Sequence, residues 1–329
     1  MTEVTAPVTT GLASASASAR RTPVLMDCDP GHDDALAITL ALARPELQVL
    51  GITTVGGNAP LAATTRNALR VLALLGRTDV PVAAGGVQPL VRPLETAPEV
   101  HGVTGLDGAD LPEPASSPRP EGAVEFLRAT LAAAPAPVTL IATGPLTNVA
   151  LLLLTYPEVA PKIARISLMG GAMRAGNWTP AAEFNIWVDP EAARIVFRSG
   201  LCTTMSGLDV THKALFGWPE IARLDALGTR AGTVFADLMR FFVRFHLERY
   251  GSADTPIHDA VAVAAVALPE LITTNRFHVD VETSGDITRG RTVVDDRGVP
   301  GATPNVDVAL DIDRAAFADL LIEAVASYR

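Results

Sequence analysis

The 329-residue sequence predicts an α/β fold with an open, mostly parallel (mixed) sheet flanked by helices. From Val24 onward, short β-branched runs alternate with helical stretches, which is the pattern of parallel strands joined by crossover helices. The first run, Val24 to Met26, is apolar throughout, as expected for a strand that is buried on both faces. Neither an internal repeat nor a linker divides residues 23–329, so we expect them to form a single domain.

The predicted elements follow from the length and periodicity of the apolar runs. Short runs bounded by Gly, Pro, Asn or Asp are typical of strands, and longer runs with apolar residues three or four apart are typical of helices. The predicted strands are residues 24–28, 47–53, 81–84, 138–142, 165–169, 202–205 and 306–311, with 276–282 and 291–294 as a hairpin. The predicted helices are residues 33–43, 61–75, 121–133, 146–154, 191–197, 230–250, 259–267 and 314–327.

Residues 85–120 are rich in Pro and Gly and form a predicted loop. This loop is too long to be a simple connection, and loops of that length are often functional. His101 and Gly102 within it are compatible either with a mobile flap near a substrate or with a surface loop.

The composition excludes several classes of protein. The apolar fraction of 48% supplies a large core, and the formal charge of −10 argues against binding to nucleic acid or to an anionic membrane. No apolar run reaches the length of about 18 residues that a transmembrane helix needs. Cys28 and Cys202 lie in strand-like apolar runs, as expected for small buried thiols in a reducing compartment.

Residues 1–22 are predicted to be a disordered N-terminal tail. Residues 13–19 alternate Ala and Ser and have no apolar side chains large enough to form a core. Arg20 and Arg21 are not followed by the apolar stretch of an export signal, which favours a cytoplasmic protein. An organelle transit peptide stays an alternative, because the tail is rich in Ser and poor in acids.

The strongest local feature is the acidic segment 27–34 (DCDPGHDD), directly after the first strand. Asp27 and Asp29 share one face of the strand end. Asp33 and Asp34 lie where a helix begins, and capping or the helix dipole accounts for them. Capping and the helix dipole do not account for Asp27 and Asp29, whose like charges repel each other. A bound cation would remove this repulsion. Oxygen ligands alone select a hard ion, Ca²⁺ or Mg²⁺.

A second acid, Asp259, follows His258 at a loop-to-helix junction. Asp259 either caps the helix that it begins or joins the first acids as a metal ligand, with His258 beside it as a group that titrates near neutral pH. Gly31 is expected to allow the sharp turn between Asp29 and the first helix.

Polar residues also follow several other predicted strands. They occur in segments 53–58 (TTVGGN), 142–148 (ATGPLTN) and 168–171 (LMGG), and the last leads to Asn177 and to 183–185 (EFN). Ligands of such sheets bind at the carboxyl ends of the strands. We therefore expect one polar crevice, and amides and carboxylates without Arg or Lys suit a neutral polyhydroxyl ligand better than a phosphate.

Four segments in this order resemble the calcium-dependent nucleoside hydrolases, the inosine-uridine preferring N-ribohydrolases. They are 27–35 (DCDPGHDDA), 53–58 (TTVGGN), 183–192 (EFNIWVDPEA) and 258–259 (HD). The resemblance extends from Val24 over nearly all of the remaining chain. It implies one Ca²⁺ at the carboxyl edge of the sheet and hydrolysis of the N-glycosidic bond of ribonucleosides to ribose and free base.

The resemblance also implies roles for individual residues. Asp29 would be a metal ligand and the general base on a metal-bound water, and His258 matches the position linked to protonation of the leaving base. Asp27 would be a neighbouring acid of the site. The other implied metal ligands are Asp34, Asp259 and the backbone carbonyl of Thr143. The implied substrate-binding residues are Asp33 and Asn185 for ribose hydroxyls, Asn177 and Glu183 for the 5′-hydroxyl, Asn58 on the water side and Met169 near the sugar.

This assignment agrees with the chemistry of the reaction. Cleavage develops positive charge on the ribosyl ring and negative charge on the departing base. Carboxylates stabilise the first charge, and a proton donor stabilises the second.

The choice between purine and pyrimidine stays open at this stage, as does a riboside other than a common nucleoside. The aromatic residues of helix 230–250 are either core residues or contacts of the base, and Trp178 is either a stacking surface or a loop residue. The helix residues concerned are Phe241, Phe242, Phe245, His246 and Tyr250.

Two other functions remain alternatives. A non-catalytic, Ca²⁺-dependent nucleoside- or sugar-binding protein would keep the ligands but needs neither the Asp29 base nor the His258 acid. A phosphatase of the haloacid-dehalogenase type shares an Asp-x-Asp motif after a strand, but it requires a Lys in its phosphate site. Lys162 and Lys213 do not lie at such a strand end. We expect a homodimer or homotetramer, as is common among soluble enzymes and in this family.

Overall fold

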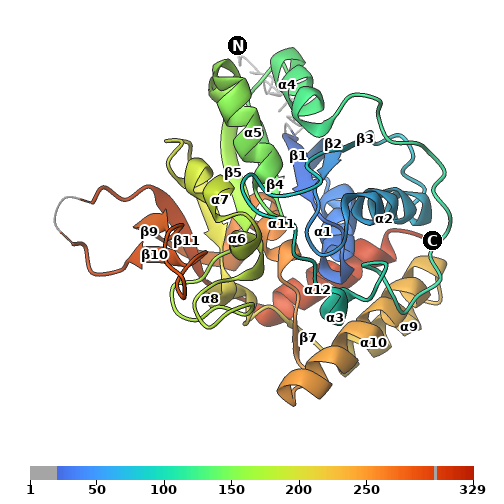
Figure 1. Ribbon diagram of the computed structural model, residues 1–329. Helices are drawn as coiled ribbons and strands as arrows, with labels where there is room; N and C mark the ends of the chain where they lie inside the picture. The colour runs from blue at the N-terminus through green and yellow to red at the C-terminus, as the bar shows by residue number, and fades with distance from the viewer. Residues whose placement is uncertain (1–20, 300–301) are drawn as a thin grey trace, which may run out of the picture.

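The computed structural model describes residues 21–299 and 302–329, which form a nine-stranded sheet with helices on both faces (Figure 1). The strand order is β10-β9-β11-β6-β5-β4-β1-β2-β3. Neighbours from β11 to β3 pair in parallel, whereas β9 pairs antiparallel with β11 and with β10. The predicted single α/β domain with a mostly parallel, mixed sheet is confirmed.

The bounds of the strands are β1 (Thr22–Cys28), β2 (Leu47–Thr54), β3 (Val82–Ala84), β4 (Val138–Ala142), β5 (Ile163–Met169), β6 (Thr203–Ser206), β9 (Ile272–Val281), β10 (Thr292–Asp295) and β11 (Val306–Ile312). A separate two-stranded sheet pairs β7 (Leu215–Phe216) with β8 (Thr255–Pro256). The predicted hairpin is the antiparallel pair β9 and β10, which extends to the left of the body in Figure 1.

The bounds of the helices are α1 (His32–Ala43), α2 (Leu61–Leu74), α3 (Pro98–His101), α4 (Ala123–Ala133), α5 (Thr147–Thr155), α6 (Phe184–Val188), α7 (Pro190–Phe197), α8 (Leu208–Thr211), α9 (Trp218–Ala226), α10 (Arg230–Tyr250), α11 (Asp259–Ala267) and α12 (Arg314–Ala326), with 3-10 turns at Pro157–Lys162 and Pro269–Leu271. The predicted bounds of α10 and α11 are the same as those observed. The elements that sequence analysis missed are mostly too short to show a period.

The two faces of the sheet support two hydrophobic clusters. Val24 and Met26 of β1 point into one cluster, with residues of α1, α2, α10, α11 and α12. Leu25 points into the other, with residues of α4, α5 and α7. This alternation is the period of a strand that is covered on both faces, and it explains why β1 is apolar throughout.

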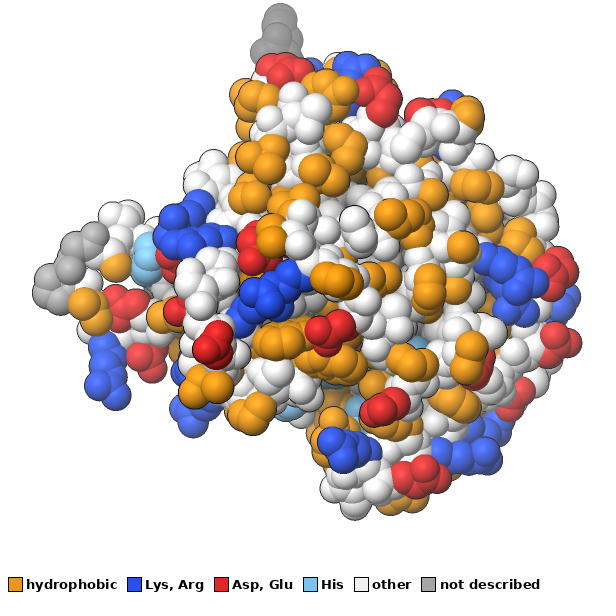
Figure 2. Space-filling view, viewed as in Figure 1, with side chains coloured by type: hydrophobic (Ala, Val, Ile, Leu, Met, Phe, Trp, Pro, Cys, Tyr) orange, Lys and Arg blue, Asp and Glu red, His pale blue; other side chains and the backbone are white. Residues whose placement is uncertain are grey.

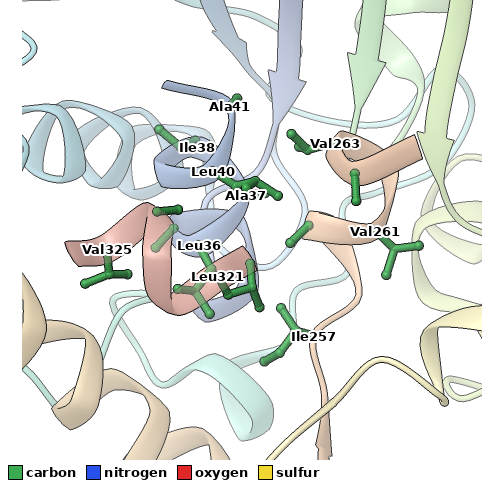
Figure 3. Close-up of a cluster of buried hydrophobic side chains, with 14 of the residues drawn as sticks. Leu36, Ala37, Ile38, Leu40, Ala41, Ile257, Val261, Val263, Leu321 and Val325 are labelled. Carbon is green, nitrogen blue, oxygen red and sulfur yellow. The ribbon is translucent and has the colours of Figure 1, made fainter. Parts of the chain in front are cut away.

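Packing between α1 and α11 places two acidic helix starts side by side. Figure 3 shows Leu36 and Ala37 of α1 in one apolar cluster with Val261 of α11 and Leu321 of α12. None of the residues labelled in that figure is charged. Because Asp33 and Asp34 lie in the first turn of α1 and Asp259 begins α11, the apolar contact brings their carboxylates together at one end of the helices.

Three expectations are corrected or limited by the structure. Cys202 is exposed and precedes β6, so it is not the buried strand thiol that was predicted, whereas Cys28 is buried in β1. Gly31 has an ordinary φ of −105°, so the turn does not require glycine for its backbone. A Cβ there would instead lie 2.6 Å from His101 Nδ1. The predicted tail lies outside the described residues except Arg21 and Thr22, and Thr22 begins β1.

None of the helices within the described residues combines the length and the apolar character needed to cross a membrane. On the face shown in Figure 2, acidic and basic side chains are interspersed.

Candidate functional site

The candidate site lies at the carboxyl ends of the neighbouring strands β1 and β4. The chain adds β2 and β3 on one side of β1 and then continues with β4 on the other side. β1 pairs with β2 on one side and with β4 on the other, so consecutive crossovers leave in opposite directions from this point. Such switch points form ligand crevices in open α/β sheets. A cavity of about 560 Å³ opens there.

Nine of the eleven predicted site residues line this cavity, although they come from distant parts of the chain. The nine are Asp33, Asn58, Thr143, Met169, Asn177, Glu183, Asn185, His258 and Asp259. The other two, Asp29 and Asp34, are completely buried behind the cavity lining.

Asn58 connects the two buried acids. Its backbone N–H donates to Asp29 Oδ2 at 2.7 Å, and its side-chain amide donates to the Asp29 carbonyl at 3.1 Å and to Asp34 Oδ2 at 3.3 Å. Asp34 also accepts the Gly31 N–H at 2.9 Å and the Thr143 hydroxyl at 2.8 Å. These bonds fix both carboxylates, so that their orientation does not depend on a ligand.

Two further carboxylates, those of Asp33 and Asp259, form a tight acidic cluster with Asp34. Asp33, Asp34 and Asp259 each offer an oxygen within 4.8 Å of the others. Asp259 is the first residue of α11, and the N-cap position before it is taken by His258, so Asp259 is not the capping residue. The three carboxylates that lie closest together thus include Asp33. The three carboxylate ligands that the resemblance implies include Asp29 instead.

Burial and mutual repulsion raise the pKa values of these acids. Burial, followed by the charge of Asp34, raises the pKa of Asp29 well above its usual range. The same two causes raise the pKa of Asp33 to about 7. Burial and the charge of Asp33 raise the pKa of Asp259 well above its usual range. The cluster therefore lacks a positive partner.

The residues present fit a hard divalent cation. None of the ion pairs among the described residues involves Asp29, Asp33, Asp34 or Asp259. Asp29 Oδ1 is buried and has no hydrogen-bond partner among the described residues. A cation would satisfy that oxygen and neutralise the cluster, and an all-oxygen donor set favours Ca²⁺ or Mg²⁺.

Two glycines leave room for Asp29. A Cβ on Gly57 would lie 2.0 Å from Asp29 Oδ2, and a Cβ on Gly144 would lie 2.7 Å from Asp29 Oδ1. Both glycines belong to the polar segments that follow β2 and β4. Only glycine allows such a close approach of the backbone to a carboxylate at these two positions.

Asp27 is held beside the cluster rather than in the cavity. Its Oδ1 accepts the Thr53 hydroxyl at 2.6 Å and the Asn148 amide at 2.8 Å. Burial raises its pKa to about 6, although both hydrogen bonds oppose that shift. The side chain thus ties the ends of β1, β2 and α5 together.

One wall of the cavity is organised by Glu183, which caps α6. Its Oε1 accepts the Asn185 N–H at 2.9 Å, and its Oε2 accepts those of Gly171 at 2.9 Å and Ile186 at 3.2 Å. Burial raises the pKa of Glu183 to about 7. These contacts hold the start of α6 against the turn that follows β5.

The amide of Asn185 links this wall to the acidic cluster. Its Nδ2 donates to the Thr143 carbonyl at 2.8 Å and approaches the carbonyl and sulfur of Met169 at 3.3 Å and 3.5 Å. Asn177 Oδ1 accepts the Phe184 N–H at 3.0 Å. The wall therefore presents amides and carbonyls next to the carboxylates, a surface suited to hydroxyl groups.

The opposite end of the cavity is rich in histidine. His258 Nδ1 lies 2.8 Å from the Thr211 hydroxyl, which leaves Nε2 as its other polar atom. Burial and the nearby His212 and His246 hold the pKa of His258 well below its usual range. All three histidines line the cavity.

The aromatic residues of α10 belong partly to the core and partly to the lining of the cavity. Phe242 is completely buried in the core and also lines the cavity, as do Phe245, His246 and Tyr250 farther along the helix. Phe241 instead stacks on His32, with ring centroids 5.1 Å apart. Trp178 lines the cavity and packs on Phe184, so it is not only a loop residue.

His101 was predicted to lie either in a mobile flap near the substrate or in a surface loop. In the structure it is buried in the cavity wall. Its Nδ1 accepts the His32 N–H at 3.3 Å and lies 3.2 Å from His32 Nδ1. His32 Nε2 in turn lies 2.8 Å from the Asp107 carbonyl. No role was predicted for His32, although its position inside the acidic segment was a usable signal.

Comparison with known proteins assigns the family. The family model "Inosine-uridine preferring nucleoside hydrolase" matches residues 24–319. A pyrimidine-specific ribonucleoside hydrolase, RihA, of Citrobacter koseri is 54% identical over 307 residues, which cover 93% of this chain and 98% of that protein. RihA of Escherichia coli O139:H28 is 53% identical with 93% and 99% coverage.

Solved structures agree with these relatives. A purine-preferring ribonucleoside hydrolase from Gardnerella vaginalis has a TM-score of 0.88 at 33% identity and covers 93% of this chain and 98% of its own. A plant nucleoside hydrolase has a TM-score of 0.87 at 33% identity, with 94% and 100% coverage. Neither the binding-protein alternative nor the phosphatase alternative is favoured by these matches. The chain belongs to the inosine-uridine preferring nucleoside hydrolase family, whose members act on N-glycosyl bonds.

Proposed function

We propose that this protein hydrolyses the N-glycosidic bond of ribonucleosides with the help of one Ca²⁺, and releases ribose and free base. The observation that carries the proposal is the buried carboxylate cluster next to a cavity lined by amides on one side and histidines on the other. This arrangement separates groups that stabilise a positive ribosyl ring from groups that serve a departing base.

The proposed ligands of the ion are Asp29, Asp34, Asp259 and the carbonyl of Thr143. When bound, Ca²⁺ would supply the positive charge that the cluster lacks and orient the attacking water and the ribose hydroxyls. Asp33, which lies in the same cluster and lines the cavity, would accept a hydrogen bond from a ribose hydroxyl.

Asp29 is the proposed general base. It would accept a proton from the attacking water, and the Asn58 N–H, which donates to Oδ2, would hold the carboxylate in place. Asn185 would bind a ribose hydroxyl, Glu183 and Asn177 would hold the 5′-hydroxyl, and Asn58 and Met169 would contact the water and the sugar.

His258 is the proposed proton donor to the leaving base. Thr211 fixes one ring nitrogen, and the other is then available to a substrate in the cavity. A positioned donor of this kind typically contributes roughly 10²- to 10⁴-fold to the rate.

We propose a preference for pyrimidine ribonucleosides. The support is the identity of 54% to a relative named as pyrimidine-specific, against 33% to a solved structure named as purine-preferring. We also propose a cytoplasmic protein that acts in nucleoside salvage, and the free thiols of Cys28 and Cys202 fit a reducing compartment. The predicted homodimer or homotetramer stays a prediction.

A substrate panel tests the function directly. Uridine, cytidine, inosine and p-nitrophenyl riboside are incubated with the protein, and released reducing sugar is measured, with p-nitrophenyl phosphate as the control for phosphatase activity. We expect uridine and cytidine to be cleaved faster than inosine and the phosphate ester to stay intact. No release of ribose from any riboside would contradict the proposal.

Chelation tests the metal. We expect excess EGTA to abolish turnover and added Ca²⁺ to restore it. The ion also stabilises the folded state, so chelation should lower the Tm, since binding at about 100 times Kd contributes about 2.7 kcal/mol. Unchanged activity and unchanged Tm in EGTA would exclude the metal role.

A further inference from the structure

Glu95 contacts two tryptophans at once from the long connection between β3 and α4. A single carboxylate oxygen, Oε2, accepts the indole N–H of Trp178 at 3.2 Å and that of Trp187 at 3.0 Å. The Glu95 side chain is exposed, whereas both tryptophans are partly buried. Glu95 belongs to none of the motifs described above, and it is not among the cavity-lining residues.

The two tryptophans lie in the segment that carries the proposed ribose-binding residues Asn177, Glu183 and Asn185. Trp178 follows Asn177 directly, lines the cavity and packs edge-on against Phe184, with ring centroids 4.9 Å apart at 65°. Trp187 lies in α6, two residues after Asn185. Glu95 thus bridges both ends of the segment that forms the amide wall.

Apolar contacts and one hydrogen bond also join this connection to the wall. A small apolar cluster joins Ala97 to Phe184 and Val188, with Leu94, Val100 and Trp178 packed against it. Farther back, the Leu90 N–H donates to Asp189 at 2.9 Å. A backbone hydrogen bond of 3.2 Å from Trp178 to Ala182 closes the loop that presents Asn177. The indole of Trp178 adds a contact from outside this loop, directly beside Asn177, whose Oδ1 accepts the Phe184 N–H.

We propose that Glu95 is a positioning residue for the 5′-hydroxyl end of the substrate. By fixing the Trp178 indole, it would hold Asn177 in the orientation that binds the 5′-hydroxyl. This inference rests on the proposed function of the cavity. Hydrogen bonds to a charged acceptor are stronger than those to a neutral one, so loss of Glu95 should cost about tenfold in substrate binding.

A spectrum of the indole N–H groups tests the bridge without any substrate. The chain has three tryptophans, and Trp218 on exposed α9 is an internal reference. In a ¹H–¹⁵N correlation spectrum of the full chain, Glu95→Ala should shift the Trp178 and Trp187 indole signals and leave that of Trp218 in place. Three unchanged signals would overturn the proposal.

Kinetics test the positioning role with matched substrates. We expect Glu95→Ala to lower kcat/KM for uridine about tenfold through KM, with kcat changed less than about twofold. With 5′-deoxyuridine the loss should stay below about twofold, because the group that Asn177 binds is missing. Equal losses with both substrates would overturn the positioning role.

Three further variants separate positioning from a general structural effect. Glu95→Gln keeps an acceptor oxygen and should retain most of the activity, whereas Trp178→Phe keeps the ring without the N–H and should reproduce the loss of Glu95→Ala. Glu99→Ala removes another exposed carboxylate of the same connection and should behave as the unmodified chain does. If the unmodified chain cleaves no riboside, the proposed function fails, while the indole spectrum still decides whether the bridge exists.

Discussion

At the carboxylate end of the pocket, the acids follow β1 or begin the helices α1 and α11, whereas the histidine end is formed by α10 and by segments outside the central sheet. Asp29 and Asp34 are completely buried, and hydrogen bonds to Asn58 fix them. At the other end Tyr250 is 59% exposed and Phe245 is only partly buried.

We infer from this difference that the carboxylate end carries the reaction and that the histidine end selects the base. The carboxylates are buried between the edge of the sheet and the starts of two packed helices, where a displacement would disturb all of these elements. The side chains of α10 can change without disturbing the sheet. We therefore expect substitutions at the carboxylate end to affect all substrates alike, and substitutions at the histidine end to affect substrates according to their base.

The largest effect is expected for Asp29→Ala, which removes a proposed metal ligand and the proposed base together. Turnover should fall by roughly 10³-fold or more for every riboside, because both contributions are lost at once. Initial rates at saturating Ca²⁺, together with calorimetric titration of the ion, measure this. A loss below about tenfold would show that Asp29 is not part of the reacting centre.

His258→Ala should lower the turnover of different substrates to different extents, according to their leaving group. We expect a loss of about 10²-fold for uridine and of less than about tenfold for p-nitrophenyl riboside, whose leaving group needs no proton. Steady-state kcat with both substrates is the measurement. Equal losses for both would argue against a proton donor at this position.

Glu183 allows a test of the carboxylate end that is independent of activity. Its pKa rises from 4.5 to about 7 on burial in the folded protein, so the folded state binds the proton more tightly than the unfolded chain. The stabilisation is therefore complete below about pH 4.5 and is lost as the pH rises through about 7, with a total of about 3 kcal/mol.

The test compares the free energy of unfolding of the unmodified chain with that of Glu183→Gln. The advantage of the unmodified chain should fall as the pH rises through this range. Urea denaturation at saturating Ca²⁺, from pH 4.5 to pH 8, measures it. The glutamine variant loses the titrating group, and the other acids cancel in the difference. A difference that does not change with pH would mean that Glu183 keeps its ordinary proton affinity.

The smallest effect is expected at Phe245, which lines the histidine end. Phe245→Ala should raise KM for uridine about tenfold or less, because an aromatic surface near the base is lost. The ratio of kcat/KM for uridine and inosine should change, while cleavage of all ribosides persists. If uridine and inosine lose activity in the same proportion, Phe245 has no part in the selection of the base.

Much of the carboxylate end was predictable because its signals are local. An apolar strand followed by Asp29, and a helix that begins near Asp33, are both visible within one short segment. The amphipathic and apolar runs that became α10 and α11 gave the bounds of those helices. The histidine end gave weaker signals, since a phenylalanine on a helix fits the core and a pocket equally well.

The bridge from Glu95 to Trp178 and Trp187 was invisible in the sequence, because its partners are 83 and 92 residues apart along the chain. The same holds for the burial of His101 against His32, which are separated by 69 residues. The exposure of Cys202 was predicted wrongly because an apolar run does not show where its strand begins.

The sequence by itself determined which residue types follow each strand, the start of the first helix in the acidic segment, and the family to which this order of motifs belongs. Tertiary structure decided which of these residues meet. Asp259 joins Asp33 and Asp34 because α1 and α11 pack side by side through apolar side chains, and Thr143 joins them because β4 pairs with β1. Local patterns specify strands and helix ends, but only long-range pairing and packing set the distances between them.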